Sequence, residues 1–261
     1  MASEYYKVTL GHAVSNENGK STGGKPGDQK QNESNDKGEL LFQDYYISGG
    51  EKWDFLLRCK SEYMGSLIAE DVIKAVRNIA IGYSQDRRYT LYDNVKPAAF
   101  DCDDTTTKVD CDCSSLVTVA ANYAGIPIPR DTSTSTMKTR YANTKMFTTY
   151  TSKAYTTASD KLKVGDILVR AGYHTATVVN IYYHFTRTLK YVEGSLMSGA
   201  DVKALQYRLN ELGIPDKELV VDGELGKKTD EAIKKYQKAC SLEVDGIVGR
   251  ITATALGFLY Y

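Results

Sequence analysis

The spacing of apolar residues predicts two helices in the first half of the chain. Between residues 66 and 81 the apolar side chains recur at helical intervals and fall on one face: Leu67, Ile68, Val72, Ile73, Val76 and Ile79. Residues 113–124 are mostly apolar, Gly125 is a natural C-terminal cap, and Pro127 prevents the helix from continuing. We therefore expect an amphipathic helix followed by a buried one.

From residue 161 onward the pattern changes to that of strands. Three runs of apolar or β-branched residues predict them: residues 166–170, 174–183 and 189–193. Polar, Gly-rich or Thr-rich stretches predict loops or irregular structure in three places: residues 15–38, 99–112 and 131–160. Helices followed by an antiparallel sheet give an α+β fold for this first domain.

Residues 196–261 contain an internal repeat, V-D-G-x-x-G-x-x-T, with copies at 221–229 and 244–252. Asp-Gly forms a tight turn, the second Gly permits another positive φ, and the Thr can cap the next helix. Helices are expected at three places: residues 201–212, residues 229–240, and from 252 onward. The chain is thus predicted to hold two domains, 1–195 (an extension, 1–65, and a core, 66–195) and a small three-helix module, 196–261.

Composition narrows the class of protein. The chain has 33 basic and 33 acidic residues, so its net charge of zero argues against a nucleic-acid binder. We find no basic stretch followed by an apolar run at the start and no apolar window of about 18 residues, so neither a signal peptide nor membrane insertion is expected. The protein is therefore expected to be made in the cytoplasm.

Cysteine usage points to chemistry at one position. Five cysteines in a chain without a predicted secretion signal do not suggest a disulfide framework. The closest three, Cys102, Cys111 and Cys113, lack the C-x2–4-C spacing of zinc sites. Cys113, however, begins the buried helix, where free N–H groups and the helix dipole are expected to lower the thiol pKa and to help stabilise an oxyanion.

A cysteine nucleophile needs a base, and the chain has three histidines: His12, His174 and His184. His174 begins the apolar strand 174–183, which can place its imidazole beside a helix that packs on the same sheet. A third polar group must then orient that imidazole. Glu193, at the end of the predicted return strand, is the first candidate, and Asn180 and His184 are the alternatives.

These residues resemble the motifs of NlpC-type cysteine peptidases. Residues 112–117, D-C-S-S-L-V, resemble the nucleophile motif D-C-S-[GS]-[LF]-V, and G-D-I-L at 165–168 with H-T-A-T-V-V at 174–179 resembles the two strands of the histidine. Helix 66–81 and Gly82-Tyr83 resemble the family's first helix and its approach to the site. The resemblance covers residues 66–195 and implies a papain-like fold with Asp112, Ser114 and Tyr83 near the thiol of Cys113.

The related CHAP amidase and peptidase group shares this layout. Residues 191–194, Y-V-E-G, resemble its V-E-[GQ]-N segment and support Glu193 as the orienting group, although Ser195 stands where that group carries Asn. Some CHAP relatives hold calcium in a loop before the nucleophile, and here that loop carries several carboxylates, of which Asp101, Asp103 and Asp104 are the candidate ligands. Because they lack the regular spacing of a calcium loop, the favoured interpretation is a solvated loop with no metal or other cofactor, and calcium binding is the alternative.

The two ends of the chain carry further resemblances. The pattern of Gly, Asn and Asp residues at 15–29, followed by Trp53, is similar to the opening of some Firmicutes prophage lysins. Trp53 or nearby tyrosines would then stack on sugar, or the segment would be a structural cap. Residues 201–249 resemble the peptidoglycan-binding domain of type one, through D-V-K-A-L-Q-Y-R-L-N-E-L-G at 201–213 and both Asp-Gly turns.

Together the resemblances imply a phage or prophage endolysin, a hydrolase whose partner is bacterial peptidoglycan. Cys113 would attack an amide bond of the wall stem peptide, His174 would act as base and Glu193 would orient it. An endopeptidase is favoured because the cysteine motif is closer to the NlpC type. The alternatives are an N-acetylmuramoyl-L-alanine amidase and a non-catalytic wall-binding protein. Without a signal peptide, a holin would release the protein to the wall.

Overall fold

The computed structural model describes residues 6–30, 38–47, 52–185 and 187–260. The chain divides into two compact units, a larger one of Val8–Ile181 and a smaller one made mainly of Tyr182–Tyr261. Each unit has its own hydrophobic core. Within the described residues, no helix is long and apolar enough to cross a membrane.

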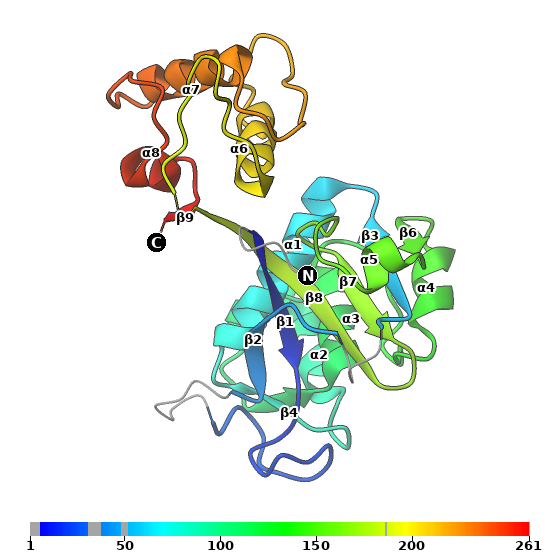
Figure 1. Cartoon of the computed structure of the whole chain (residues 1–261). Helices are drawn as coiled ribbons and strands as arrows, with labels where there is room; N and C mark the ends of the chain where they lie inside the picture. The colour runs from blue at the N-terminus through cyan, green and yellow to red at the C-terminus, as the bar shows by residue number, and fades with distance from the viewer. Residues whose placement is uncertain (1–5, 31–37, 48–51, 186, 261) are drawn as a thin grey trace. The chain divides into compact units, whose positions relative to one another are not determined.

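The larger unit is built on a sheet with the strand order β2-β1-β8-β7-β3-β6 (Figure 1). The strands are β1 (Tyr6–Ala13), β2 (Leu40–Asp44), β3 (Phe55–Cys59), β6 (Phe147–Tyr150), β7 (Ile167–Arg170) and β8 (His174–Phe185). Four pairings, β1–β2, β3–β6, β3–β7 and β7–β8, are antiparallel. The mixed α+β fold with an antiparallel sheet is therefore confirmed.

The segment 1–65 is part of this sheet. It supplies β1, β2 and β3, and β1 lies directly beside β8. The sheet is thus not confined to the predicted core, 66–195. Both faces of β1 are buried near its end: a Cβ added to Gly11 would meet Val72 of α1, whereas Leu10 and His12, also buried, lie on the opposite face of the strand.

Two helices cover the sheet and contribute to the core. α1 (Glu62–Arg77) starts where Ser61 accepts a hydrogen bond from the backbone N–H of Met64, and α3 (Cys113–Tyr123) starts at a capping box between Asp112 and Ser115. The two helices pack on each other. All residues of α3 from Cys113 to Ala121 are buried, which fits its small and apolar side chains. Both predicted helices are therefore present, within a few residues of their expected bounds.

A short parallel pair leads the chain into α3. β4 (Ile81–Tyr83) pairs with β5 (Val109–Cys111), and Asp112 alone separates β5 from the helix. The expected loop 99–112 was thus partly wrong, because it also holds the 3-10 turn Cys102–Asp104. Helix α2 (Thr90–Val95) and the 3-10 turn Lys96–Ala98 connect β4 to this region.

The expectation of irregular structure over 131–160 was also wrong. This segment forms α4 (Met137–Asn143), β6 and α5 (Lys153–Thr156). Met137 and Tyr141 are fully buried, and the hydroxyl of Tyr141 donates to the carbonyl of Val117 in α3. Burial against α3 has overridden the weak helix preference of a Thr-rich and Ser-rich sequence.

The Gly-Asp motif at the start of β7 has a structural reason. Gly165 has φ +85°, and a Cβ placed on it would lie 2.2 Å from the carbonyl oxygen of Gly65 in α1. The next residue, Asp166, is buried and accepts two hydrogen bonds from Arg58 of β3. The motif therefore lets α1 approach β7 closely and ties β7 to its neighbouring strand.

The smaller unit contains α6 (Ala200–Glu211), α7 (Lys227–Ala239) and α8 (Arg250–Ala255). Short strand β9 (Leu259–Tyr260) pairs in parallel with the last two residues of β8. The predicted strand 189–193 is absent. Leu189 forms an isolated bridge with Val248, and residues 190–195 are coil and turn.

The two repeats of the smaller unit are fastened in the same way. Gln206 donates to the Asp222 carboxylate and to the Thr229 hydroxyl, and its side-chain oxygen accepts from the N–H of Gly223. Gln237 makes the matching bonds to Asp245, Thr252 and Gly246 of the second repeat. Each glutamine also donates to a backbone carbonyl, that of Glu224 or of Ile247. The prediction that each Thr caps a helix was wrong, because α7 and α8 begin two residues earlier and the threonines bind glutamine instead.

Candidate active site

The sulfur of Cys113 lies where the start of α3 meets the start of β8. It accepts hydrogen bonds from the backbone N–H groups of Ser114, in its own helix, and of Thr175, in β8. Thr175 directly follows His174. The fold thus brings together the two residues that the sequence singled out as nucleophile and base, 61 positions apart.

Burial sets the charge state of this cysteine. Cys113 is 6% exposed, and loss of hydration together with the Asp112 carboxylate raises its pKa to about 12. The expected lowering of the pKa was therefore wrong: the N–H groups and Arg88 favour the thiolate, but burial outweighs them. Burial also lowers the pKa of His174 to about 4. At neutral pH the pair is a neutral thiol beside a neutral imidazole.

The second ring nitrogen of His174 is held by a residue from the other end of the chain. Nε2 of His174 lies 2.8 Å from Nδ1 of His12 in β1, and the two rings meet edge to face. Nε2 of His12 lies 3.2 Å from Oε1 of Gln43 in β2. Because β2, β1 and β8 are consecutive in the sheet, the three side chains form one row across neighbouring strands.

His12 occupies the position for which the sequence favoured Glu193. Glu193 is exposed, lies in a turn and belongs to the smaller unit. Asn180 is six residues from His174 on the same strand, roughly 20 Å away at the rise of a β-strand. The side chain of His184 lies outside those that the structure describes. The nitrogen of His174 that these candidates would have oriented is bonded to His12.

One sequence signal could have pointed to His12. It is one of three histidines, and it shares one face of a strand with the apolar residues Val8 and Leu10. A histidine that is 2% exposed needs a polar partner, and here the ring contacts three: His174, Gln43 and Tyr46. The partners themselves could not be read from local sequence.

Aromatic residues surround the pair of histidines. The Tyr46 hydroxyl is 3.4 Å from Nδ1 of His12, and Trp53 packs on Tyr46 and near His174. Trp53 is fully buried and its indole N–H donates to the carbonyl of Tyr46. Trp53 is therefore part of the packing around Tyr46 and His174. Because it has no exposed surface, the expectation that Trp53 itself stacks on sugar was wrong.

The remaining residues of the cysteine motif are held by one arginine. Arg88 forms an ion pair with Asp112, 3.0 Å, and donates to the Ser114 hydroxyl and to the carbonyl of Thr132. Asp112 in turn accepts from the backbone N–H of Ser115 and from the Ser114 hydroxyl. This network fixes the start of α3, and with it the position of Cys113.

Tyr83 ends β4 close to the thiol. Burial and the Cys113 group raise the pKa of Tyr83, so its hydroxyl stays a neutral hydrogen-bond donor. Its backbone N–H donates to the buried carboxylate of Glu39, 2.8 Å. The same two causes raise the pKa of Tyr46. Two neutral tyrosine hydroxyls thus lie near the sulfur.

The candidate calcium loop is arranged differently from a metal site. Asp101 binds the ammonium group of Lys74 and caps the 3-10 turn, while Asp103 and Asp104 are exposed. Within the part of the chain that the structure describes, no group of three or more histidine, cysteine or acidic side chains is placed to hold a metal ion.

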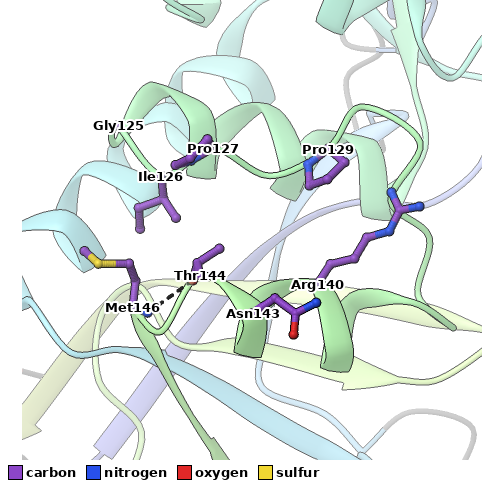
Figure 2. Close-up of a pocket in the computed structure, with 8 residues that line it drawn as sticks. All are labelled: Gly125, Ile126, Pro127, Pro129, Arg140, Asn143, Thr144 and Met146. Carbon is purple, nitrogen blue, oxygen red and sulfur yellow. Dashed lines mark hydrogen bonds between the residues drawn. The ribbon is translucent and has the colours of Figure 1, made fainter.

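One cavity of the larger unit lies away from the candidate site residues. It has a volume of about 470 Å³ and is lined by Gly125, Ile126, Pro127, Pro129, Arg140, Asn143, Thr144 and Met146 (Figure 2). These residues follow the C-terminal end of α3, roughly 16 Å along the helix from Cys113. None of the candidate site residues lines it.

Comparison with known proteins agrees with the division into two parts. Residues 10–182 match the family model described as an endolysin-like domain. The chain belongs to the endolysin-like domain family. That match includes His12, Gln43, Cys113 and His174 and ends before Glu193. Residues 198–256 match a putative peptidoglycan binding domain.

The endolysin-like chain is also similar to one curated protein, the N-acetylmuramoyl-L-alanine amidase CwlM of Mycobacterium tuberculosis (strain ATCC 25618 / H37Rv). The two are 41% identical over 73 residues, which is 28% of this chain and 18% of the amidase. The chain thus spans less than a fifth of that relative's length. No solved structure gives a significant match.

Proposed function

We propose that this endolysin-like protein is a cysteine-dependent peptidoglycan hydrolase that cuts an amide bond of the wall stem peptide. The observation that carries the proposal is the place of the Cys113 sulfur at the backbone N–H of Thr175, the residue after His174, whose ring in turn lies 2.8 Å from that of His12. A nucleophile, a base and an orienting group in this order are the machinery of thiol hydrolysis. Membership of the endolysin-like family and the peptidoglycan-binding match supply the substrate class.

Because Cys113 and His174 are both neutral at rest, the reaction begins with a proton transfer between them. The Cys113 thiol gives its proton to Nδ1 of His174 as the sulfur attacks the carbonyl carbon, because a thiol with a pKa of about 12 is not ionised beforehand. A carbon–sulfur bond forms, and the oxyanion is stabilised by N–H groups at the start of α3. His174 then protonates the leaving amine as the carbon–nitrogen bond breaks. Water, deprotonated by His174, hydrolyses the thioester and regenerates the thiol.

Two bonds fit this chemistry. An endopeptidase cut inside the stem peptide is favoured by the resemblance of residues 112–117 to the NlpC motif. An amidase cut between muramic acid and L-alanine is the second candidate, favoured by the similarity to a protein named N-acetylmuramoyl-L-alanine amidase. The same three residues would serve either reaction.

The smaller unit would hold the enzyme on the wall. Peptidoglycan is a polymer with repeated sites, so a tethered binder raises the local substrate concentration without new contacts at Cys113. A phage origin and release through a holin are part of this proposal. The competing function, from another class, is a wall-binding protein without activity.

The test is mass spectrometry of the products released from purified Gram-positive peptidoglycan. Wild type is compared with Cys113→Ala and with Cys240→Ala, a matched control that removes the exposed thiol of the smaller unit. We expect cut stem peptides from wild type and the Cys240 variant only. Whole stem peptides freed from intact glycan would assign the amidase reaction. Equal products from Cys113→Ala would contradict the thiol mechanism, and binding without products from any protein would favour the non-catalytic function.

A further inference from the structure

The row of histidines continues beyond His12 to an exposed glutamine. Oε1 of Gln43 lies 3.2 Å from Nε2 of His12, and Nδ1 of His12 lies 2.8 Å from Nε2 of His174. Gln43 is at the edge of the site, on β2, and its side chain is exposed. It makes no contact with the sulfur that would give it a direct chemical role.

The hydrogen bonds that link two neutral imidazole rings can run in only two directions. Burial lowers the pKa of His12 to about 3 and that of His174 to about 4, so at neutral pH each ring carries one N–H. In the first direction, Nε2–H of His174 donates to a bare Nδ1 of His12, and Nε2–H of His12 donates outward. In the second, Nδ1–H of His12 donates to a bare Nε2 of His174.

The two directions differ in what they leave for Cys113. In the first, Nδ1 of His174 is bare and can accept the thiol proton. In the second, Nδ1 of His174 carries the proton and the ring cannot act as a base toward the sulfur. A histidine tautomer is set by the hydrogen bond that its other nitrogen makes, so the outermost partner decides the state of the whole row.

We propose that Gln43 is a positioning residue that sets this direction: its side-chain oxygen accepts from Nε2 of His12 and thereby leaves Nδ1 of His174 bare for the thiol proton. The consequence for catalysis rests on the proposed cysteine mechanism, whereas the tautomers themselves do not.

Three substitutions at position 43 separate a directing role from a merely structural one. Gln43→Glu can only accept from His12, Gln43→Lys can only donate to it, and Gln43→Leu does neither. Because the side chain is exposed, all three are expected to fold, which thermal denaturation checks. Phe42→Leu, on the same strand and 38% exposed, is the matched control.

Activity on purified peptidoglycan should follow the hydrogen-bonding capacity of residue 43. We expect near wild-type kcat for Gln43→Glu and Phe42→Leu, a loss of about tenfold for Gln43→Leu, and a larger loss for Gln43→Lys. KM should change little, because Gln43 acts through the base. Equal kcat for the Glu and Lys variants would overturn the proposal.

The tautomers can be measured without any assay of activity. Protonated and bare ring nitrogens of histidine resonate in separate ¹⁵N regions, and the chain has only three histidines, so His184→Gln and His174→Gln suffice for assignment. We expect His12 and His174 to carry their protons on Nε2 in wild type and on Nδ1 in Gln43→Lys. Wild-type tautomers in every variant, or Nδ1-protonated rings in wild type, would overturn the role of Gln43. An inactive wild type with the expected tautomers would instead overturn the proposed function alone.

Discussion

Nδ1 of His12 lies 2.8 Å from Nε2 of His174, although the two residues are 162 positions apart in the chain. The contact exists because β1 is the neighbour of β8 in the sheet, so a strand from the first residues of the protein reaches the strand that carries the base. It also gives a buried histidine the polar partner that it needs. The N-terminal strands are thus part of the candidate active site.

Removing the imidazole of His12 should lower kcat without unfolding the protein. In His12→Ala, Nε2 of His174 loses its orienting partner, and we expect kcat to fall by about a hundredfold. His12→Asn retains an acceptor and should recover part of the loss. Val14→Ala, a truncation of an exposed side chain next to β1, is the control. Turnover of peptidoglycan at saturating substrate measures the effect, and full activity of His12→Ala would argue against its role.

The acid limb of the pH–rate profile should lie near pH 4. Burial lowers the pKa of His174 to about 4, so the base form persists well below the ordinary value of 6.5. The same shift makes folding stability fall as pH drops from about 6.5 toward 4, because the unfolded chain then binds more protons than the native one. The dependence of kcat/KM on pH measures the first effect, and a limb near 6.5 would show that His174 is not buried during catalysis.

A methyl group at Gly165 should destabilise the larger unit far more than one at Gly125. Both glycines have positive φ, +85° and +78°, but only Gly165 faces a backbone atom, the carbonyl oxygen of Gly65, at 2.2 Å from the added Cβ. We expect Gly125→Ala to cost about 1 kcal/mol and Gly165→Ala several kcal/mol more. Urea unfolding of the two variants measures the difference, and equal costs would contradict the close packing of α1 on β7.

The two glutamines of the smaller unit should contribute equally to its stability. Gln206→Ala and Gln237→Ala each remove four matching hydrogen bonds, to an Asp-Gly turn, a backbone carbonyl and a threonine, and each should cost about 1–3 kcal/mol. Lys228→Ala, an exposed residue of α7, is the control. Thermal unfolding and retention on peptidoglycan measure the effect of each variant. A much smaller effect of one variant would mean that its repeat is held by other contacts.

Much of the fold follows from local patterns. The spacing of apolar residues predicts α1 and α3, the Gly-Asp and His motifs predict β7 and β8, and the Asp-Gly repeat predicts the three helices of the smaller unit. These succeed because turns, caps and amphipathic faces depend on residues a few positions apart. The structure of segment 131–160, two helices and one strand, was not predicted, because its first helix, α4, depends on the burial of Met137 and Tyr141 against α3.

By itself, the sequence determined that Cys113 begins a buried helix and that His174 begins a strand, since both depend on neighbours along the chain. The tertiary structure alone decided what surrounds them. The order of the strands places His12, rather than the predicted Glu193, against Nε2 of His174. Burial raises the pKa of Cys113, although its position at a helix start predicted a lower one. The physical reason is that strand pairing and desolvation depend on residues far apart in sequence, which no local pattern records.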